Sequence, residues 1–316
     1  MKNVVILLAT YNGQQYIRQQ LDSLFAQTYQ DFRIVIHDDG STDETVNIIN
    51  EYRDKYSDRI EIIYGHSCGG AKTNFMYLLS EVEADYYLLC DQDDVWLPEK
   101  VEKSIKVLHD IENEGGRHLL HPAIVFTDMY VVDENLNIID ESFIGYLGRS
   151  SKNTSYTQVL IDNPAAGTTM CFNRALRDIA ISSKNVEWDN VPMHDAWLLE
   201  IATIYGNVRC IEKPLVYYRQ TGHNTMGAKT ESTSDKLLRN AREMRRGFFA
   251  RKKAFIDEAR MFAREILRLK DIPEDKLKVL NEFVHIGTKP KLIRMKFYRE
   301  NNFTRARHNF WMRLWV

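Results

Sequence analysis

Short apolar runs alternate with amphipathic helical patterns through the first 130 residues, and this alternation limits the fold more than any other feature. Runs that are apolar at every position are typical of strands buried on both faces. When helical patterns separate such strands, they indicate an α/β fold with a mostly parallel sheet and helices on both sides. We expect strands at 4–8, 34–36, 60–64, 86–90 and 123–127.

The helices expected between these strands follow from apolar spacing and from start signals. Apolar side chains recur at helical intervals from Ile17 to Phe25, and further helices are expected from about Thr42, over 72–82 and after Pro98. Proline is favoured in the first turn of a helix. The pattern loosens after residue 150, where we expect a strand at 168–172 and a helix over 195–205.

The chain has 316 residues, which is enough for one large domain, or for one domain with an appendage. Its longest apolar runs have the length of strands, so we expect no transmembrane helix. The N-terminus shows no signal-peptide pattern. The four cysteines are scattered without metal-ligand spacing, which favours reduced thiols in a cytoplasmic protein.

Charge is divided unevenly along the chain. Residues 1–226 hold 19 Lys and Arg against 33 Asp and Glu, a balance of −14, whereas residues 227–316 hold 23 against 11, a balance of +12. Such a split suggests two tasks and an anionic partner for the basic part. We therefore predict a catalytic domain over 1–226 and a basic, helical C-terminal region over 227–316.

Three carboxylates, Asp91, Asp93 and Asp94, directly follow the apolar run at 86–90. Like charges so close raise one another's pKa unless a cation lies between them, and Mg²⁺ or Mn²⁺ with phosphate oxygens would satisfy them. Open α/β sheets bind ligands at the carboxyl ends of their strands. The alternative is an acid-rich helix start, but Asp91 lies several residues before the start at Pro98.

Three other loops follow expected strands. The first, Ala-Thr-Tyr-Asn-Gly at 9–13, is neither GxxxxGK[ST] nor GxGxxG, which argues against P-loop and dinucleotide-binding proteins. In the second, Asp38 and Asp39 could accept hydrogen bonds from a base or a ribose, or cap the next helix. The third, 66–74, places two glycines and Lys72 at a helix start, which favours an anion or is a plain turn.

The order of these loops resembles the family 2 glycosyltransferases, which have the GT-A fold. The resemblance covers roughly residues 3–225, and it rests on Ala-Thr-Tyr-Asn at 9–12, Asp-Asp-Gly-Ser-Thr-Asp at 38–43 and Asp-Gln-Asp-Asp at 91–94. The form Asp-Gln-Asp-Asp-Val-Trp looks like the branch that includes bacterial rhamnosyltransferases.

The resemblance implies a set of donor and metal contacts. Asp91 and Asp93 match the family's DxD motif, with Asp93 as the main metal ligand and Asp91 on the ribose or on metal-bound water. Asp94 would face the donor sugar or support the loop. The donor-binding residues expected in all are Thr10, Tyr11, Asn12, Asp39, Lys72, Asn74, Asp91, Asp94 and Arg219.

The family also has an acidic catalytic base about 100 residues after that motif, as the second residue of an acidic pair. Here Asp195 matches it, and His194 stands in the first position. From first principles Asp195 begins a helix, where a carboxylate is stabilised, and without the resemblance a plain N-cap is the favoured interpretation.

A loop at 218–224 resembles the segment that closes the site in this branch. His223 would ligate the metal or touch the diphosphate, or be an ordinary surface histidine, and Arg219 would pair with phosphate. The acceptor side would include Gly167 and Thr168. His194 and Trp197 could bind an acceptor sugar or serve in packing.

Basic residues interleave with apolar and aromatic residues over 236–270 and 289–316. This pattern suits an anionic membrane surface. A helix face packed on the catalytic domain, or an interface in a homo-oligomer, would explain it as well. Nucleic acid is disfavoured by the acidic first 226 residues.

The sequence therefore predicts an inverting glycosyltransferase that is assisted by Mg²⁺ or Mn²⁺ and uses Asp195 as base. The expected donor is dTDP-L-rhamnose, and the expected acceptor is a lipid-linked cell-wall or capsular polysaccharide precursor. We expect a cytoplasmic protein held peripherally on the inner face of the cell membrane. The alternatives are a nucleotidyltransferase acting on sugar phosphates and a non-catalytic protein that tethers membrane or nucleic acid.

Overall fold

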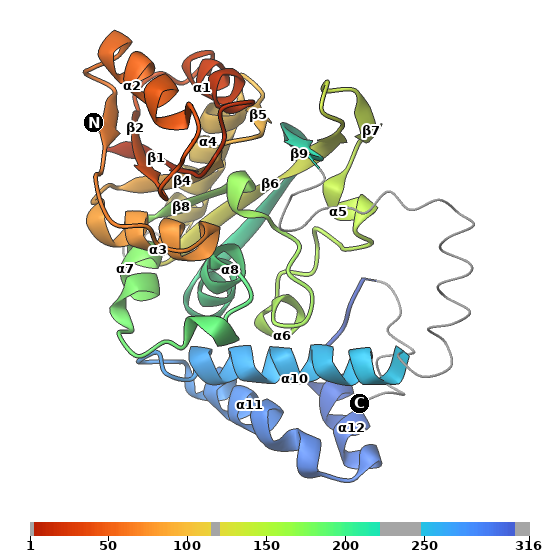
Figure 1. Cartoon of the computed structure of the whole chain (residues 1–316). Helices are drawn as coiled ribbons and strands as arrows, with labels where there is room; N and C mark the ends of the chain where they lie inside the picture. The colour runs from red at the N-terminus through yellow and green to blue at the C-terminus, as the bar shows by residue number, and fades with distance from the viewer. Residues whose placement is uncertain (1–2, 115–120, 222–247, 307–316) are drawn as a thin grey trace.

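The fold is built on one large sheet flanked by helices (Figure 1). The computed structural model describes residues 3–114, 121–221 and 248–306. Within them nine strands pair in the order β3-β2-β1-β4-β8-β6-β9-β5, and β7 pairs with β6. The strands are β1 (Val4–Thr10), β2 (Arg33–Asp38), β3 (Ile60–Ile62), β4 (Tyr86–Asp91), β5 (Val95–Trp96), β6 (Ala123–Val132), β7 (Ile138–Asp140), β8 (Met170–Asn173) and β9 (Asn207–Arg219).

The strand directions agree with the predicted α/β class. Strands β1 to β4 are mutually parallel, and β6 and β9 run the same way because both are related to β4 through the antiparallel β8. Strands β5, β7 and β8 are reversed. Six of the nine described strands thus share one direction, which confirms the mostly parallel sheet.

The helices begin and end within a few residues of the expected positions where the apolar pattern was clear. The helix expected from about residue 42 begins at Thr45, and the one expected at 195 begins at His194. The helices are α1 (Ile17–Phe25), α2 (Thr45–Lys55), α3 (Ala71–Glu81), α4 (Lys100–Glu114), α5 (Phe143–Tyr146), α6 (Tyr156–Val159), α7 (Arg174–Ser182), α8 (His194–Tyr205), α10 (Phe248–Ile266), α11 (Glu274–His285) and α12 (Lys291–Glu300), with 3-10 turns η1 (Gly167–Thr169), η2 (Trp188–Asn190) and η3 (Ile286–Thr288).

Strand β1 shows why the early runs are apolar at every position. All seven of its residues are buried. Val4, Ile6 and Leu8 point into a core with α1, α2 and α4. Val5 and Leu7 point into the opposite core, with α3, α7 and α8. Because successive strand side chains alternate between faces, a sheet covered on both sides needs apolar residues throughout.

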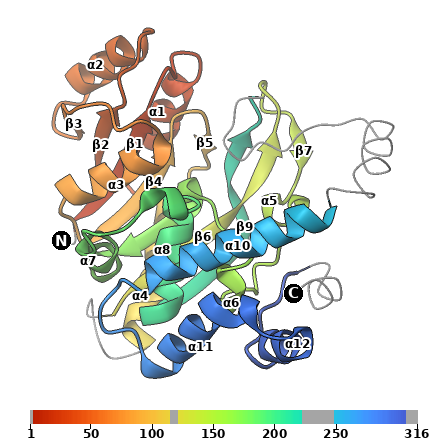
Figure 2. The same ribbon diagram turned by 60° about the horizontal axis from the view of Figure 1, so that its bottom comes forward.

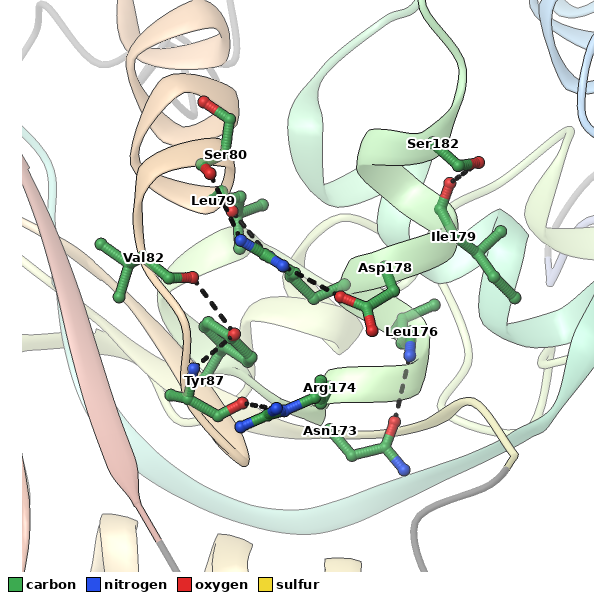
Figure 3. Close-up of polar contacts among 12 residues, drawn as sticks. Leu79, Ser80, Val82, Tyr87, Asn173, Arg174, Leu176, Asp178, Ile179 and Ser182 are labelled. Carbon is green, nitrogen blue, oxygen red and sulfur yellow. Dashed lines mark hydrogen bonds and ion pairs between the residues drawn. The ribbon is translucent and has the colours of Figure 1, made fainter.

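Helix α7 is fixed to the sheet and to α3 by side-chain hydrogen bonds (Figure 3). The Asn173 side chain caps the helix by accepting from the backbone N–H of Leu176 at 3.2 Å. The Arg177 Nε donates to the Leu79 carbonyl at the end of α3, at 2.7 Å. The bond from Arg177 to Leu79 holds α3 and α7 together on the face where α8 packs.

The C-terminal helices pack beneath the face that carries α8 (Figures 1 and 2). Phe262 of α10, Phe283 of α11 and Tyr298 of α12 belong to the same hydrophobic cluster as Trp197 of α8. The predicted boundary at 226/227 lies outside the described residues, so the division into two domains stays a prediction. Within the described part of the chain, α10 to α12 share one hydrophobic core with α3, α7 and α8.

No helix among the described residues is long and apolar enough to cross a membrane. The four cysteines are free thiols.

Candidate functional site

A cavity of about 980 Å³ opens at the carboxyl ends of β1, β2 and β4. It lies where the predicted loops meet, because parallel strands bring their ends to one edge. Its lining comes from the loops after these strands, the start of α3, the α5–α6 segment and the start of α8: Ala9, Thr10, Tyr11, Asn12, Gly13, Gln15, Tyr16, Asp39, Ser67, Gly69, Gly70, Ala71, Asn74, Asp91, Gln92, Asp93, Glu134, Phe143, Arg149, Ala165, Ala166, Gly167, Met193, His194, Asp195, Tyr218 and Thr221.

Asp91 and Asp93 both line this cavity, as the sequence predicts. Burial, together with the charges of Asp93 and Asp195, raises the pKa of Asp91 to about 7. The pKa of Asp93 is raised as well, chiefly by burial. Two carboxylates that are hard to ionise without a nearby cation are suited to a divalent metal.

The third acidic residue of the cluster, Asp94, is buried on the side of the acidic loop that faces away from the cavity. Its side chain is fully buried, and Oδ1 accepts from the Arg219 backbone N–H at 3.3 Å. Burial, with Asp93 and Asp91 nearby, holds its pKa well above the ordinary range. Asp94 is not among the residues that line the cavity. Of the two roles expected for it, this position suits support of the loop.

Arg219, a predicted donor contact, also lies behind the acidic loop and outside the cavity lining. Only 1% of its surface is exposed. Its Nε donates to the Asp93 carbonyl at 2.9 Å, Nη1 donates to the Glu134 carbonyl, and Nη2 donates to Gln19 Oε1 at 2.5 Å. The guanidinium also stacks 4.6 Å from the Tyr16 ring. Arg219 therefore positions the backbone that carries the carboxylates.

Asp195 lies in the first turn of α8 and faces the same cavity. Burial raises its pKa to about 6, although the Ala196 and Gly167 backbone N–H groups and the charge of Arg149 lower it. Asn163 Nδ2 donates to Asp195 Oδ1 at 3.3 Å. A buried carboxylate with a pKa near neutrality is suited to accept a proton from a hydroxyl group.

The four predicted acceptor residues divide between cavity and core. His194 and Gly167 line the cavity, and a Cβ at position 167 would lie 2.5 Å from His194 Nε2, so only glycine fits. Burial lowers the pKa of His194 to about 3, so this ring is neutral. Thr168 is buried and accepts from Trp96 Nε1 at 3.2 Å. Trp197 lies in the core, where Nε1 donates to the Ala180 carbonyl at 3.0 Å.

The first loop is tied to the acidic loop through Gln92. Its Oε1 accepts from the Tyr11 N–H at 2.9 Å, and its Nε2 donates to the Tyr11 carbonyl at 2.7 Å. The Tyr11 side chain is left 55% exposed. Thr10 Oγ1 donates to Asp38 Oδ2 at 2.7 Å, and Asn12 Oδ1 accepts from the Thr42 N–H at 2.8 Å. Thr10, Tyr11 and Asn12 all line the cavity.

The third loop closes around Asp39. Its carboxylate accepts from Ser67 Oγ at 3.0 Å, from the Gly69 and Gly70 N–H groups at 3.2 and 2.7 Å, and from the Cys68 N–H. Gly70 has a φ of +136°, a backbone conformation that side chains disfavour. This arrangement shapes the loop, and Asp39 remains part of the cavity wall.

Asn74 and Lys72 begin α3 but face different surroundings. Asn74 lines the cavity, and its Oδ1 lies 2.8 Å from His37 Nδ1. Lys72 Nζ donates to the Val191 carbonyl at 2.9 Å and to the Trp188 carbonyl. Lys72 therefore supports the segment before α8, and it is not among the lining residues.

The predicted metal ligands can be tested only in part. His223 lies outside the described residues. Within the described ranges no group of three or more His, Cys, Asp or Glu side chains could hold a metal ion. Two carboxylates with substrate phosphates are nevertheless a usual Mg²⁺ set, and the raised pKa values of Asp91 and Asp93 fit such an ion.

Several lining residues were not predicted. Gln92 stands inside the acidic motif, so its position carried a signal that could have been used. Arg149 and Glu134 have no such signal, because each stands in an irregular segment without a recognisable spacing. Their place in the cavity depends on the path of the chain after β6.

Comparison with known sequences shows relatives among the glycosyltransferases. The family described as "Glycosyl transferase family 2" matches residues 5–128. Over 237 residues the chain is 30% identical to dTDP-rhamnosyl transferase RfbG of Shigella flexneri, covering 70% of this chain and 74% of the relative. It is 24% identical over 238 residues to an uncharacterized glycosyltransferase of a Nostoc species, covering 73% and 69% of the two chains.

Solved structures share the fold. Residues 1–349 of TarS from S. aureus, in complex with UDP-GlcNAc, superpose with a TM-score of 0.57 at 19% identity, covering 96% of this chain and 75% of that one. The mannosyltransferase PcManGT from Pyrobaculum calidifontis, in complex with GDP-Man and Mn²⁺, gives 0.53 at 14% identity, covering 94% and 75%. The architecture is GT-A, as predicted, and the chain belongs to glycosyltransferase family 2.

Proposed function

We propose that this protein transfers a sugar from a nucleoside-diphosphate sugar to an acceptor hydroxyl with inversion at the anomeric carbon. The observation that carries the proposal is that Asp91, Asp93 and Asp195 face one cavity, where the charges of Asp93 and Asp195 help to raise the pKa of Asp91. Metal-binding carboxylates at one end and a base at the other are what such a displacement requires.

In the proposed reaction, the acceptor oxygen forms a bond to the anomeric carbon as the bond from that carbon to the donor phosphate breaks. Asp195 takes the hydroxyl proton, and the nucleoside diphosphate leaves with the electron pair. The backbone N–H groups of Ala196 and Gly167 stabilise the ionised carboxylate before the reaction. His194, which is neutral at physiological pH, does not compete with Asp195 for that proton.

Asp93, with help from Asp91, would hold Mg²⁺ or Mn²⁺, which when bound would neutralise charge on the departing diphosphate. Arg219 keeps the backbone of these two residues in place. Thr10, Tyr11, Asn12, Asp39 and Asn74 would surround the nucleoside, because they line the cavity beside the acidic loop.

The proposed donor is dTDP-L-rhamnose. Two observations support it: the Asp-Gln-Asp-Asp-Val-Trp sequence at 91–96 and the 30% identity to the dTDP-rhamnosyl transferase RfbG. The proposed acceptor is a growing lipid-linked polysaccharide, of the cell wall or of a capsule.

The release of free nucleoside diphosphate tests the proposal directly. The full chain is incubated with dTDP-rhamnose and a panel of other sugar nucleotides, with Mg²⁺, with Mn²⁺ or with EDTA. We expect turnover of at least one donor, lost in EDTA and in Asp93→Asn. If the protein neither binds nor turns over any donor, the proposed enzyme is refuted. Release of pyrophosphate would indicate nucleotidyl transfer instead.

We further propose that the protein docks on the anionic inner face of the cell membrane, where a lipid-linked acceptor would lie. At the start of α12, Leu292 is 79% exposed and Ile293 is 50% exposed. Lys289, Lys291 and Lys296 beside them are exposed too. Exposed apolar side chains with cations beside them suit an anionic lipid surface. Each cation near such a surface contributes about 1 kcal/mol to binding.

Co-sedimentation with phosphatidylglycerol vesicles tests this docking. We expect the double variant Leu292→Ser, Ile293→Ser to bind fewer vesicles than the unchanged protein. The matched control is Ile138→Ser, Ile139→Ser on β7, where the side chains are 51% and 44% exposed. Equal losses in both variants, or no loss in either, would rule out α12 as the docking element.

A further inference from the structure

Arg149 lowers the pKa of Asp195 by its charge, but the proposed reaction gives it no contact with a substrate. Among the lining residues that the structure describes, it is the one with a positive charge at neutral pH, since His194 is neutral. Its side chain is 19% exposed. Arg149 belongs to the segment between α5 and α6, which lies away from β1 and β2 (Figure 1).

The pairing of Arg149 within the protein is incomplete. Its Nε lies 3.5 Å from Asp162 Oδ1, longer than a normal hydrogen bond. The same oxygen receives Arg305 Nη2 at 3.2 Å. The Asp162 side chain is 2% exposed. One buried carboxylate is therefore shared by two guanidinium groups, those of Arg149 and Arg305. Asp162 can neutralise one of these two guanidinium charges, and Asp195 is the other carboxylate whose charge acts on Arg149.

Arg305 links this group to the C-terminal helices. It lies in the short segment that follows α12, and this segment packs on α6. Gln158 Nε2 of α6 donates to Thr304 Oγ1 at 3.0 Å, and Thr157 Oγ1 donates to the Asn302 carbonyl at 3.4 Å. The helix proposed to meet the membrane is therefore followed directly by the segment that anchors Asp162.

We infer that Arg149 binds a phosphate group of the acceptor, and that Asp162 and Arg305 position it. This inference rests on the proposed function, in which the acceptor is carried on a lipid diphosphate. A guanidinium presents a planar fork of donors that matches phosphate oxygens. The donor's own diphosphate would be held at the other end of the site, beside Asp91 and Asp93.

The placement of charges favours this assignment over a purely structural role. A buried guanidinium in a structural role is normally satisfied by good hydrogen bonds, because an unpaired buried charge is costly. Arg219 illustrates that case, with hydrogen bonds from its Nε, Nη1 and Nη2. For Arg149, in contrast, the 3.5 Å ion pair with Asp162 is the one ion pair or hydrogen bond that its side chain makes with a described residue. Its remaining donors are open to a ligand in the cavity.

Calorimetric titration separates the phosphate of the acceptor from that of the donor. The full chain is first titrated with dTDP and Mg²⁺, and the saturated protein is then titrated with glucose 1-phosphate as the probe. Methyl glucoside is the neutral control ligand. We expect Arg149→Gln to weaken glucose 1-phosphate binding at least about tenfold, because a hydrogen bond to a charged group is lost. Binding of dTDP should change less than twofold.

Three further variants test the positioning roles. Arg149→Lys keeps the charge without the fork and should recover part of the affinity, while Asp162→Asn and Arg305→Gln should each weaken the probe with dTDP binding unchanged. Arg53→Gln on α2 is the matched surface control. All variants must keep the melting temperature of the dTDP complex within a few degrees of the parent protein.

Each outcome decides the inference. Loss of probe affinity alone supports it. Weakened dTDP binding in Arg149→Gln would overturn it by assigning the phosphate to the donor. Unchanged binding of both dTDP and glucose 1-phosphate in Arg149→Gln would also overturn it. So would equal binding of methyl glucoside and glucose 1-phosphate by the unchanged protein. If the unchanged protein binds no nucleoside diphosphate, the proposed function fails instead, which the first titration reveals separately.

Discussion

Asp195 combines burial with an ionisable carboxylate, and a base for a hydroxyl group needs both. Its pKa of about 6 leaves it mostly ionised at neutral pH and still basic enough to take a proton. Without the family resemblance the sequence would have left it an ordinary helix-start aspartate. The residue acquires its character from the fold, which buries it beside Asn163 and the turn at Gly167.

Replacement of this base should stop turnover without disturbing the donor site. We expect Asp195→Asn to lower kcat by about 10²- to 10⁴-fold, since the proton acceptor is removed, while dTDP affinity stays within about twofold. Asp178→Asn, an exposed position on α7, is the control. Nucleoside diphosphate release and calorimetry measure the two quantities, and a variant that keeps most of its kcat would contradict the assigned role.

The same carboxylate predicts the pH profile of the reaction. Because the ionised form accepts the proton, kcat/KM should rise with pH through about 6 and level off above it. Release of nucleoside diphosphate at fixed metal concentration between pH 5 and 9 provides the profile. A rate that falls as the pH rises from 5 to 7 would show that a protonated group is needed instead.

Asp91 should make the metal-free protein less stable as the pH rises. Its folded pKa of about 7 lies above the ordinary 3.8, so the folded state favours the protonated form. The stability linked to that proton is present below about pH 4 and is lost as the pH rises towards 7. Relative to the unchanged protein, Asp91→Asn should gain about 2 kcal/mol of unfolding free energy between pH 5 and 8.

Urea denaturation in EDTA measures this difference, which cancels the pH effects of all other groups. Mg²⁺ with dTDP should remove the advantage, since the cation then stabilises the ionised carboxylate. A difference that is flat with pH would show that burial and the neighbouring carboxylates do not raise the pKa of Asp91.

Residue types and spacing found the acidic motif and the base, but not which way each side chain points. Asp91, Asp93 and Asp195 face the cavity, as the sequence predicts, whereas Arg219 and Lys72 turn to backbone carbonyls. A loop has two sides, and its sequence alone does not distinguish them. Donor contacts at those two positions therefore stay predictions.

The elements differ in how well their sequences predicted them. Strands β1, β2 and β4 each contain an unbroken apolar run because both faces of the sheet are covered there, so these runs stand out in the sequence. Strand β9 was not predicted, because Lys213 and Pro214 interrupt its apolar pattern where its register on β6 shifts. Helix α6 has only four residues, too few for a helical period to show.

Strand β9 ends at Arg219, which joins the acidic loop, α1 and the turn after β6. We expect Arg219→Met to lower the free energy of unfolding by about 2–4 kcal/mol, because several buried hydrogen bonds are lost. It should also weaken metal-dependent dTDP binding, since Asp93 loses its backbone anchor.

Arg209→Met on the same strand is the matched control, because that arginine is half-exposed and pairs with Glu114 at the surface. Urea denaturation and calorimetry measure the two effects. If Arg219→Met destabilises the protein but leaves dTDP affinity unchanged, Arg219 supports the fold without positioning the acidic loop.

For the molecule as a whole, the charge division near residue 226 is not matched by a division of the core. Lys276 Nζ of α11 donates to the carbonyls of Thr203 and Ile204 in α8, at 2.9 and 2.7 Å. Glu265 of α10 accepts from the Glu187 N–H at 2.9 Å. Composition showed the change of surface charge, but a shared core depends on contacts between distant segments.

Removal of the C-terminal helices should therefore unfold more than the part removed. A chain ending at residue 221 would expose the side of Trp197 and α8 that Phe262 and its neighbours cover. Since apolar surface contributes about 25 cal/mol per Å² buried, the loss should exceed the few kcal/mol that keep a domain folded. We expect aggregation, or an unfolding transition without cooperativity, whereas a chain ending at residue 306 should keep a single transition. Calorimetric scans of both chains make the comparison, and cooperative unfolding of the 1–221 chain near the full-length melting temperature would show that the catalytic region folds alone.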